Sequence, residues 1–198
     1  MRQKTELRRS LLAEIAAADP DTLAAASRRI AQQLTATSEW RNAELVLAYR
    51  SMRGEPDTAP LLQAALAEGK LVALPRIVGS FLQYHQYTGK STSFSRHPFG
   101  MEEPTASSPV IDTARAEPGK RILVIVPGLA FDAQGGRLGR GKGYYDRFLA
   151  ARSSHLTAAG ICFDLQLRPL LPMEAHDARV ELVVTESLVI RTHAGPSV

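Results

Sequence analysis

The sequence predicts an α/β fold: one domain in which a mainly parallel central sheet is flanked by helices, giving three layers. Short apolar segments typical of buried strands alternate with helical segments of about ten residues, the pattern of βαβ units. The length of 198 residues suits one domain with a sizeable core. A composition of 44% hydrophobic and 22% charged residues is that of a soluble globular protein rather than a disordered one. We therefore treat residues 1–198 as a single domain.

Two helices are predicted at the start of the chain, within residues 4–37. Apolar residues of the first recur at helical spacing at Leu7, Leu11, Leu12 and Ile15. Asp19-Pro20 ends this helix. The apolar positions of the second helix are Leu23, Ile30 and Leu34, ahead of Trp40.

The alternation of strands and helices begins after these two helices. Residues 44–49 are typical of a buried strand, and residues 58–69 of a helix with Thr58 as its N-cap and Gly69 at its end. Three more strands are predicted from apolar or alternating runs at 71–75, 81–87 and 121–127.

The second half of the chain adds a helix over 144–153, a strand over 157–163, and one or two strands over 180–190. The stretch 91–118 interrupts the alternation and is rich in Ser, Pro and Gly. It is either a long ordered loop beside the functional site or a plain surface excursion.

Charge and cysteine content narrow the classes of partner. The net charge of +4 favours acidic partners. Basic residues gather in the N-terminal KTELRR and in the loop RLGRGKGYYDRF (137–148), not in a long stripe. This distribution favours a small polyanion over nucleic acid. The lone Cys162 excludes a disulfide framework and suits a reducing compartment. Because no signal peptide or membrane span is visible, we expect a cytoplasmic protein that does not bind membranes. We also expect it to be a monomer and not to bind nucleic acid.

The basic loop is predicted to bind phosphate. It lies between a strand ending at Pro127 and a helix starting near Tyr144, where open α/β sheets bind ligands and helix N-termini attract anions. Its glycines let backbone amides approach an anion closely. It departs from a P-loop at Gly143, where Ser or Thr would hold magnesium, and from a dinucleotide fingerprint at Tyr144. A tight, basic surface turn is the alternative.

Asp146, in the first turn of the predicted helix, supplies an oxygen ligand that magnesium favours. The simpler interpretation is a carboxylate that stabilises the helix dipole.

The segment VPGLAFDAQGGRLGRGKGYYDRFL (126–149) strongly resembles the signature of the 5-formyltetrahydrofolate cyclo-ligase family, also called methenyltetrahydrofolate synthetases. Weaker similarities follow in the family's order along most of the chain: KTELRRSL, YRSMRGEPDT (49–58), LPR (74–76), FGMEEP (99–104) and HDARVELVVTE (176–186). The resemblance implies an enzyme that uses ATP and Mg²⁺ to convert 5-formyltetrahydrofolate into 5,10-methenyltetrahydrofolate, releasing ADP and phosphate. ATP phosphorylates the formyl oxygen so that N10 can expel it as phosphate.

The resemblance also implies a role for each candidate site residue. The residues implied in ATP binding are Lys4, Arg8, Arg76, Arg137, Leu138, Gly139, Arg140, Gly141, Lys142, Gly143, Tyr144 and Tyr145. Those implied in substrate binding are Arg50, Glu55, Arg140, Lys142 and Tyr144. Arg140 and Lys142 are the expected catalytic residues, because their charges can stabilise the transferring phosphoryl group. Asp146 and Asp177 are the expected metal ligands.

Several of these residues have simpler interpretations. Lys4 and Arg8 also fit a solvated basic helix face, and Arg76 a structural salt bridge. The two tyrosines fit a core position. Arg50 departs from the family, in which that position is often apolar and lies against the substrate. The alternative functions are a paralogue that keeps the ATP loop and acts on another small acid, and a nucleotide- or RNA-binding regulator.

Overall fold

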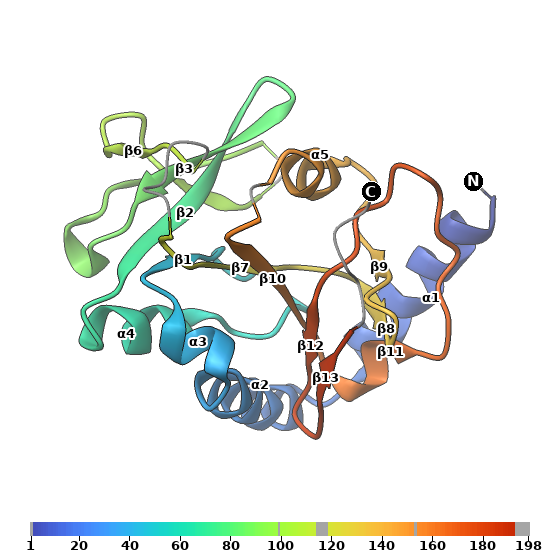
Figure 1. Ribbon diagram of the computed structural model, residues 1–198. Helices are drawn as coiled ribbons and strands as arrows, with labels where there is room; N and C mark the ends of the chain where they lie inside the picture. Colours follow the sequence, from blue (N-terminus) through green and yellow to red (C-terminus); the bar gives the residue numbers. More distant parts are fainter. Residues whose placement is uncertain (1, 99, 114–118, 153, 193–198) are drawn as a thin grey trace.

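The central sheet has eight strands in the order β13-β12-β10-β7-β1-β2-β3-β6 (Figure 1). The computed structural model describes residues 2–98, 100–113, 119–152 and 154–192. The strands of this sheet are β1 (Leu45–Leu47), β2 (Leu71–Val78), β3 (Phe81–Gln86), β6 (Val110–Ile111), β7 (Ile122–Val126), β10 (Leu156–Ile161), β12 (Leu182–Val184) and β13 (Val189–Arg191).

The sheet is parallel at its centre and antiparallel at its edges. Strands β12, β10, β7, β1 and β2 run parallel, whereas β3, β6 and β13 pair antiparallel to their neighbours. The predicted mainly parallel sheet is therefore confirmed in its centre and is mixed as a whole. The chain between β2 and β3 explains one edge: only Gly79 and Ser80 separate the paired Val78 and Phe81, and so short a turn joins antiparallel strands. Gly79 takes φ +58°, which suits the first turn position of a type II′ hairpin.

Helices cover both faces of the sheet, so the predicted three layers are confirmed (Figure 1). One face carries α2 (Pro20–Thr35), α3 (Ser38–Asn42) and α4 (Ala59–Ala67), and the other carries α5 (Tyr144–Ala150). Asp19 caps α2 by accepting a hydrogen bond from the Thr22 amide at 2.8 Å. The short α3 was not predicted, and α5 ends at Ala150; residue 153, the predicted end, lies outside the described residues.

The predicted N-cap of α4 is confirmed in position, but its side chain makes no capping hydrogen bond. Thr58 occupies the N-cap position, but its hydroxyl donates to the Tyr49 carbonyl at 2.6 Å, while Asp57 Oδ1 accepts from the Ala59 amide at 3.0 Å. Thr58 thus fixes the start of α4 to the chain that leaves β1. Gly69 ends the helix as predicted, with φ +71° and the amide of Lys70 bonded to Ala65.

A second, three-stranded sheet was not predicted. It has the order β11 (Leu167–Arg168), β8 (Ala130–Asp132), β9 (Arg137–Leu138), so part of the predicted loop is a β-hairpin. Helix α1 (Arg2–Ala17) packs on this small sheet in a hydrophobic cluster of its own, which we call the α1 cluster: Leu7, Leu11, Leu129, Ala130, Leu138, Leu171 and Met173. The buried Asp132 closes the hairpin by accepting from the Gly136 amide at 2.7 Å.

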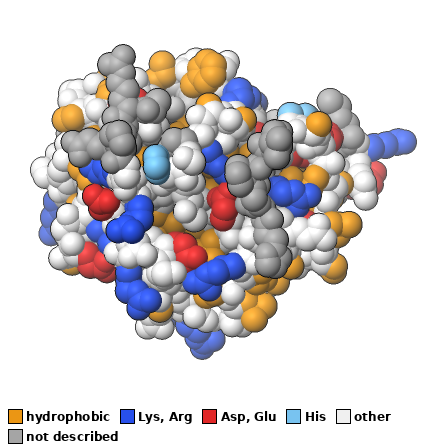
Figure 2. All heavy atoms as spheres, in the orientation of Figure 1, with side chains coloured by type: hydrophobic (Ala, Val, Ile, Leu, Met, Phe, Trp, Pro, Cys, Tyr) orange, Lys and Arg blue, Asp and Glu red, His pale blue; other side chains and the backbone are white. Residues whose placement is uncertain are grey.

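The stretch 91–118 is ordered where it is described and lies beside the cavity treated below. Its strands β4 (Phe94–Arg96) and β5 (Glu102–Pro104) form a hairpin, and Glu103 ties β5 to β2 by accepting from the Ile77 amide at 3.0 Å. Residues 99 and 114–118 lie outside the described residues. On the face shown in Figure 2, basic and acidic side chains are interspersed. No helix in the described part of the chain is long and apolar enough to cross a bilayer.

Candidate active site

A cavity of about 440 Å³ lies where β1, β2 and β7 reach their carboxyl ends. The chain after β1, the stretch 137–146 and the β4–β5 hairpin surround it. This is the edge at which open α/β sheets bind ligands, because the loops that follow parallel strands converge there. The predicted location of the site is therefore the location of the cavity.

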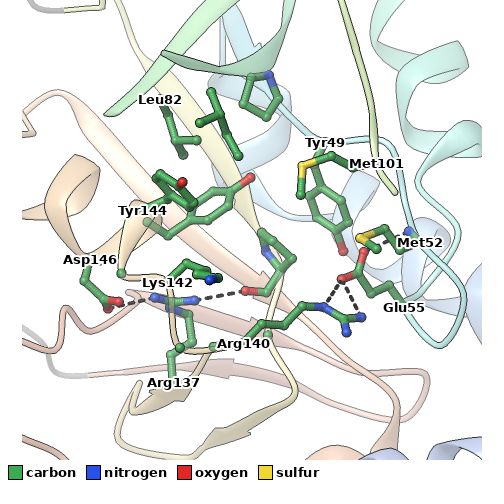
Figure 3. Close-up of a pocket in the computed structure, with 18 of the residues that line it drawn as sticks. Tyr49, Met52, Glu55, Leu82, Met101, Arg137, Arg140, Lys142, Tyr144 and Asp146 are labelled. Atoms are coloured by element: carbon green, nitrogen blue, oxygen red, sulfur yellow. Dashed lines mark hydrogen bonds and ion pairs between the residues drawn. The ribbon is translucent and has the colours of Figure 1, made fainter. Parts of the chain in front are cut away.

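One wall of the cavity is basic. Arg8, Arg137, Arg140 and Lys142 all border it, and Figure 3 labels the last three. Arg8 reaches the wall from α1, where its Nε donates to the Gly139 carbonyl at 2.9 Å. With seven residues, α5 is too short for its N-terminus to be a strong anion site, so the attraction for anions depends on these side chains.

The opposite wall is apolar. It is formed by Pro75 and Ile77 of β2, Leu82 of β3, and Met52 and Met101 from the adjoining loops. Of these residues, Figure 3 labels Leu82, Met52 and Met101. A flat aromatic or heterocyclic ligand fits such a wall better than a phosphate chain does. The cavity thus combines two chemically different halves.

Arg137 is a buried member of the basic wall and forms an ion pair. Its Nη2 lies 2.7 Å from Asp146 Oδ1, and its Nη1 donates to the Pro127 carbonyl at 3.2 Å. Gly139 makes room for this guanidinium, because a Cβ there would lie 2.7 Å from Arg137 Nη1. The pair joins β9 to α5 and fixes the shape of the stretch between them. Direct contact between Arg137 and a nucleotide stays a prediction.

Lys4 and Asp177 form a second pair at the cavity's edge. Lys4 Nζ lies 2.5 Å from Asp177 Oδ2, and the Glu174 amide donates to the same oxygen at 2.6 Å. Burial alone would raise the pKa of Asp177, but the Lys4 hydrogen bond, the Glu174 amide and the nearby charges outweigh it and lower that pKa. Lys4 is itself largely buried and holds α1 to the 174–177 turn, so the simpler interpretation as a solvated face is wrong for Lys4.

Asp146 and Asp177 both border the cavity, as a metal site would require. Asp146 pairs with Arg137 through Oδ1. Asp177 accepts from Lys4 and the Glu174 amide through Oδ2, and its Oδ1 lies 3.9 Å from His176 Nε2. No group of three or more His, Cys, Asp or Glu side chains suited to a metal occurs among the described residues. Two carboxylates nevertheless fit Mg²⁺, which usually keeps waters and completes its shell with substrate phosphates.

Glu55 joins the two halves of the cavity. Its side chain is 8% exposed; Oε1 accepts from Arg140 Nη2 at 3.2 Å, and Oε2 from the Met52 amide at 2.9 Å (Figure 3). Burial raises the pKa of Glu55, against the opposing effects of the Met52 amide and the Arg140 charge. Arg140 thus pairs with Glu55, the carboxylate predicted to bind the substrate, and also borders the region predicted to bind phosphate.

The remaining loop residues divide by burial. Tyr144 is half-buried and borders the cavity, whereas Tyr145 also packs against the core under α5 and has Arg137 above its ring at 5.8 Å. Leu138 is 2% exposed and packs in the α1 cluster, so contact with a ligand is left to its backbone. Gly141 and Gly143 both have positive φ, +94° and +69°, which other residues rarely adopt.

Two predicted arginines have structural partners. Arg76 is absent from the cavity lining; its Nη1 donates to Ser95 Oγ and the Pro104 carbonyl. The alternation of side chains along β2 explains this, since Pro75 and Ile77 on either side of it face the cavity. Arg50 does border the cavity, but its Nη2 pairs with Glu102 at 2.9 Å and its guanidinium lies 4.4 Å from the Phe94 ring centre.

Sequence reasoning missed much of the apolar wall. Tyr49, Met52, Leu82 and Met101 were not proposed, and His176 was given no role although it borders the cavity. An apolar residue at a strand end carries no sign of ligand contact by itself. The available signal was positional, because Tyr49 ends a predicted strand and Met52 lies between that strand and the proposed Glu55. Cys162 is fully buried.

The fold and the cavity together define an α/β protein whose enclosed site has one basic wall and one apolar wall. Comparison with known proteins narrows this class. A model of the 5-formyltetrahydrofolate cyclo-ligase family matches residues 1–186. A probable 5-formyltetrahydrofolate cyclo-ligase of Schizosaccharomyces pombe is 31% identical, covering 96% of this chain and 98% of its own. The cyclo-ligase of Escherichia coli strain K12 is 34% identical over 74% of this chain and 80% of its own.

A solved structure agrees with the sequence matches. The NMR structure of Aquifex aeolicus 5,10-methenyltetrahydrofolate synthetase matches with a TM-score of 0.82 and 29% identity, covering 98% of this chain and 95% of that one. The chain belongs to the 5-formyltetrahydrofolate cyclo-ligase family. It is therefore a ligase of folate metabolism, as the resemblance implied.

Proposed function

We propose that the protein uses ATP and Mg²⁺ to close 5-formyltetrahydrofolate to 5,10-methenyltetrahydrofolate, with release of ADP and phosphate. The observation that carries this proposal is the division of one cavity into a basic wall and an apolar wall with a buried carboxylate between them. A nucleotide's phosphates suit the first wall and a pterin ring suits the second. The two reactants would then meet within one enclosed space.

The chemistry asks for positioning and charge neutralisation. A formyl oxygen on nitrogen is a poor leaving group, so N10 cannot displace it directly. Transfer of the γ-phosphoryl group to that oxygen converts it into phosphate, which leaves after N10 has attacked the formyl carbon. Such a transfer needs the two substrates held in line and the developing negative charge stabilised.

Residues of the basic wall supply that stabilisation in our proposal. Lys142 and Arg140 contact the transferring phosphoryl oxygens, while Arg8 and the backbone of 139–143 hold the rest of the phosphate chain. Arg137 acts indirectly, by holding the Asp146 side chain in place. Arg50 and Tyr144 border the substrate, and Glu55 accepts hydrogen bonds from the amino groups of the pterin ring.

Asp146 and Asp177 would hold the magnesium ion together with phosphate oxygens, and the ion would neutralise phosphate charge. We place the reaction in the cytoplasm and assign it to a monomer with small-molecule substrates. The paralogue alternative would share the basic wall and differ in the ligand that occupies the apolar one.

An assay of the coupled reaction tests the proposal. We expect product formation to require ATP and a divalent cation, with ADP and methenyl product formed one to one. The methenyl chromophore and ADP are measured in the same mixture, and chelation of the cation should stop both. Chromophore formed without ATP, or ADP released without chromophore, would contradict the proposed reaction.

Glu55→Gln tests the assignment of the pterin side. The change keeps the side chain's size and removes a charge that makes hydrogen bonds about twice as strong as neutral ones. We expect folate binding to weaken by about 1–3 kcal/mol while ATP–Mg²⁺ affinity stays nearly unchanged. Calorimetry with each ligand measures both, and Glu6→Gln, at an exposed position outside the cavity lining, is the matched control. An equal loss for both ligands would instead indicate a structural role.

A further inference from the structure

Tyr49 places a buried hydroxyl beside the cavity. The residue follows β1, is 5% exposed, and belongs to the hydrophobic core cluster that also includes residues of α2 and α4. It also borders the cavity, and Figure 3 shows its hydroxyl directed toward the Glu55 carboxylate. Within the described part of the chain this hydroxyl has no hydrogen-bond partner.

A buried hydroxyl without a partner is costly, and native proteins keep few of them. The cost is recovered if a ligand supplies the missing bond. Burial, together with the nearby Glu55, Tyr145 and Cys162, raises the pKa of Tyr49 well above its ordinary value, against a smaller opposing effect of Arg140. The phenol therefore stays protonated at neutral pH and is able to donate.

We propose that Tyr49 is a substrate-contacting residue whose hydroxyl donates to the ring oxygen of the pterin, beside the amino groups bound by Glu55. The inference rests on the proposed function and names a specificity determinant within it. A 2-amino-4-oxo ring presents N–H donors and a carbonyl acceptor side by side along one edge. A carboxylate next to a hydroxyl donor is the complement of that edge, and the cavity offers the two together.

The proposal makes Tyr49 a selector of ring chemistry. Sites that hydrogen-bond a polar substituent discriminate strongly against analogues that lack it, because the buried group is then left unpaired. A ring with no oxygen at position 4 would leave the Tyr49 hydroxyl unpaired and should bind less well. The preference for the oxygen should disappear when the hydroxyl is removed.

The test compares the wild-type protein with Tyr49→Phe. We expect the dissociation constant for 5-formyltetrahydrofolate to rise about tenfold, the equivalent of one hydrogen bond. The dissociation constant for ATP–Mg²⁺ should stay unchanged. The stability of the ligand-free protein, followed by urea denaturation, should not fall, because the lost hydroxyl had no partner. Tyr87→Phe, outside the cavity lining, is the matched control.

A second arm uses 2-aminopteridine and 2-amino-4-oxopteridine as competing ligands. The wild-type protein should prefer the oxo compound, and Tyr49→Phe should bring the ratio of their inhibition constants toward one. Unchanged folate affinity in Tyr49→Phe, or an unchanged ratio, would overturn the inference, as would a loss of ligand-free stability with equal loss of both substrates. If the wild-type protein itself neither binds nor converts the folate, the proposed function fails and the inference with it.

Discussion

Replacing Lys142 by alanine is expected to lower the turnover number about 10²–10³-fold, with little effect on folding. A charge aimed at the transferring group is worth roughly 3–4 kcal/mol when it acts mainly in the transition state, by analogy with oxyanion donors. Lys142 is exposed, so its removal leaves no cavity in the core. Steady-state turnover and urea denaturation of the same preparation measure the two effects separately.

Lys90→Ala is the matched control for this substitution. Lys90 is also exposed, and it lies in the short 3₁₀ turn η1 (Gly89–Ser91) outside the cavity lining. Its removal should change neither turnover nor stability by a measurable amount. A Lys142→Ala variant that keeps most of its turnover would remove this lysine from the catalytic role and leave the basic wall as a binding surface only.

Replacing Arg137 by methionine is expected to reduce the free energy of unfolding by about 3 kcal/mol. The arginine is 6% exposed and pairs with the partly buried Asp146, and removing one member of such a pair leaves the other charge without compensation. Methionine keeps much of the side chain's volume, so the decrease in the free energy of unfolding reflects the lost charge more than lost packing. Urea denaturation measures it, and we expect activity to fall as well because the stretch 137–146 loses its anchor.

The double variant Arg137→Met/Asp146→Asn separates charge from packing. If the uncompensated carboxylate causes the loss, neutralising it should restore part of the stability. Activity should remain low in the double variant, since the proposed metal ligand is then gone. A single variant as stable as the wild-type protein would show that the pair adds nothing to folding.

The sequence predicted those elements whose signal is local. Apolar periodicity located α1 and α2, and long apolar runs located β7 and β10, because each pattern depends on residues within one element. The three-stranded sheet was not predicted because its strands have two or three residues, too few to show a periodic pattern. One antiparallel edge of the large sheet follows from the two-residue turn at Gly79-Ser80, a signal that the sequence prediction did not use.

The site was predicted best where the basic motif itself forms the wall. Gly139 to Lys142 border the cavity as expected, but the burial of Arg137 could not be foreseen, since arginine is ordinarily exposed. Its partner Asp146 is nine residues away along the chain and close only through β9 and α5. The pairing of Arg50 with Glu102 likewise joins two loops whose meeting depends on the tertiary fold.

The α1 cluster has a consequence for how variation in this protein is interpreted. Helix α1 rests on a hydrophobic patch separate from the two larger cores of the central sheet, yet it carries Lys4 and Arg8 to the cavity. Local opening of a protein follows its cooperative units, and a helix held by a small patch is one that can open without global unfolding. A substitution that removes apolar side-chain volume at Leu11 would therefore lower activity as an active-site substitution does, while the central sheet stayed folded. We therefore expect that substitutions in the α1 cluster are limited by their effect on ligand binding as well as by their effect on packing.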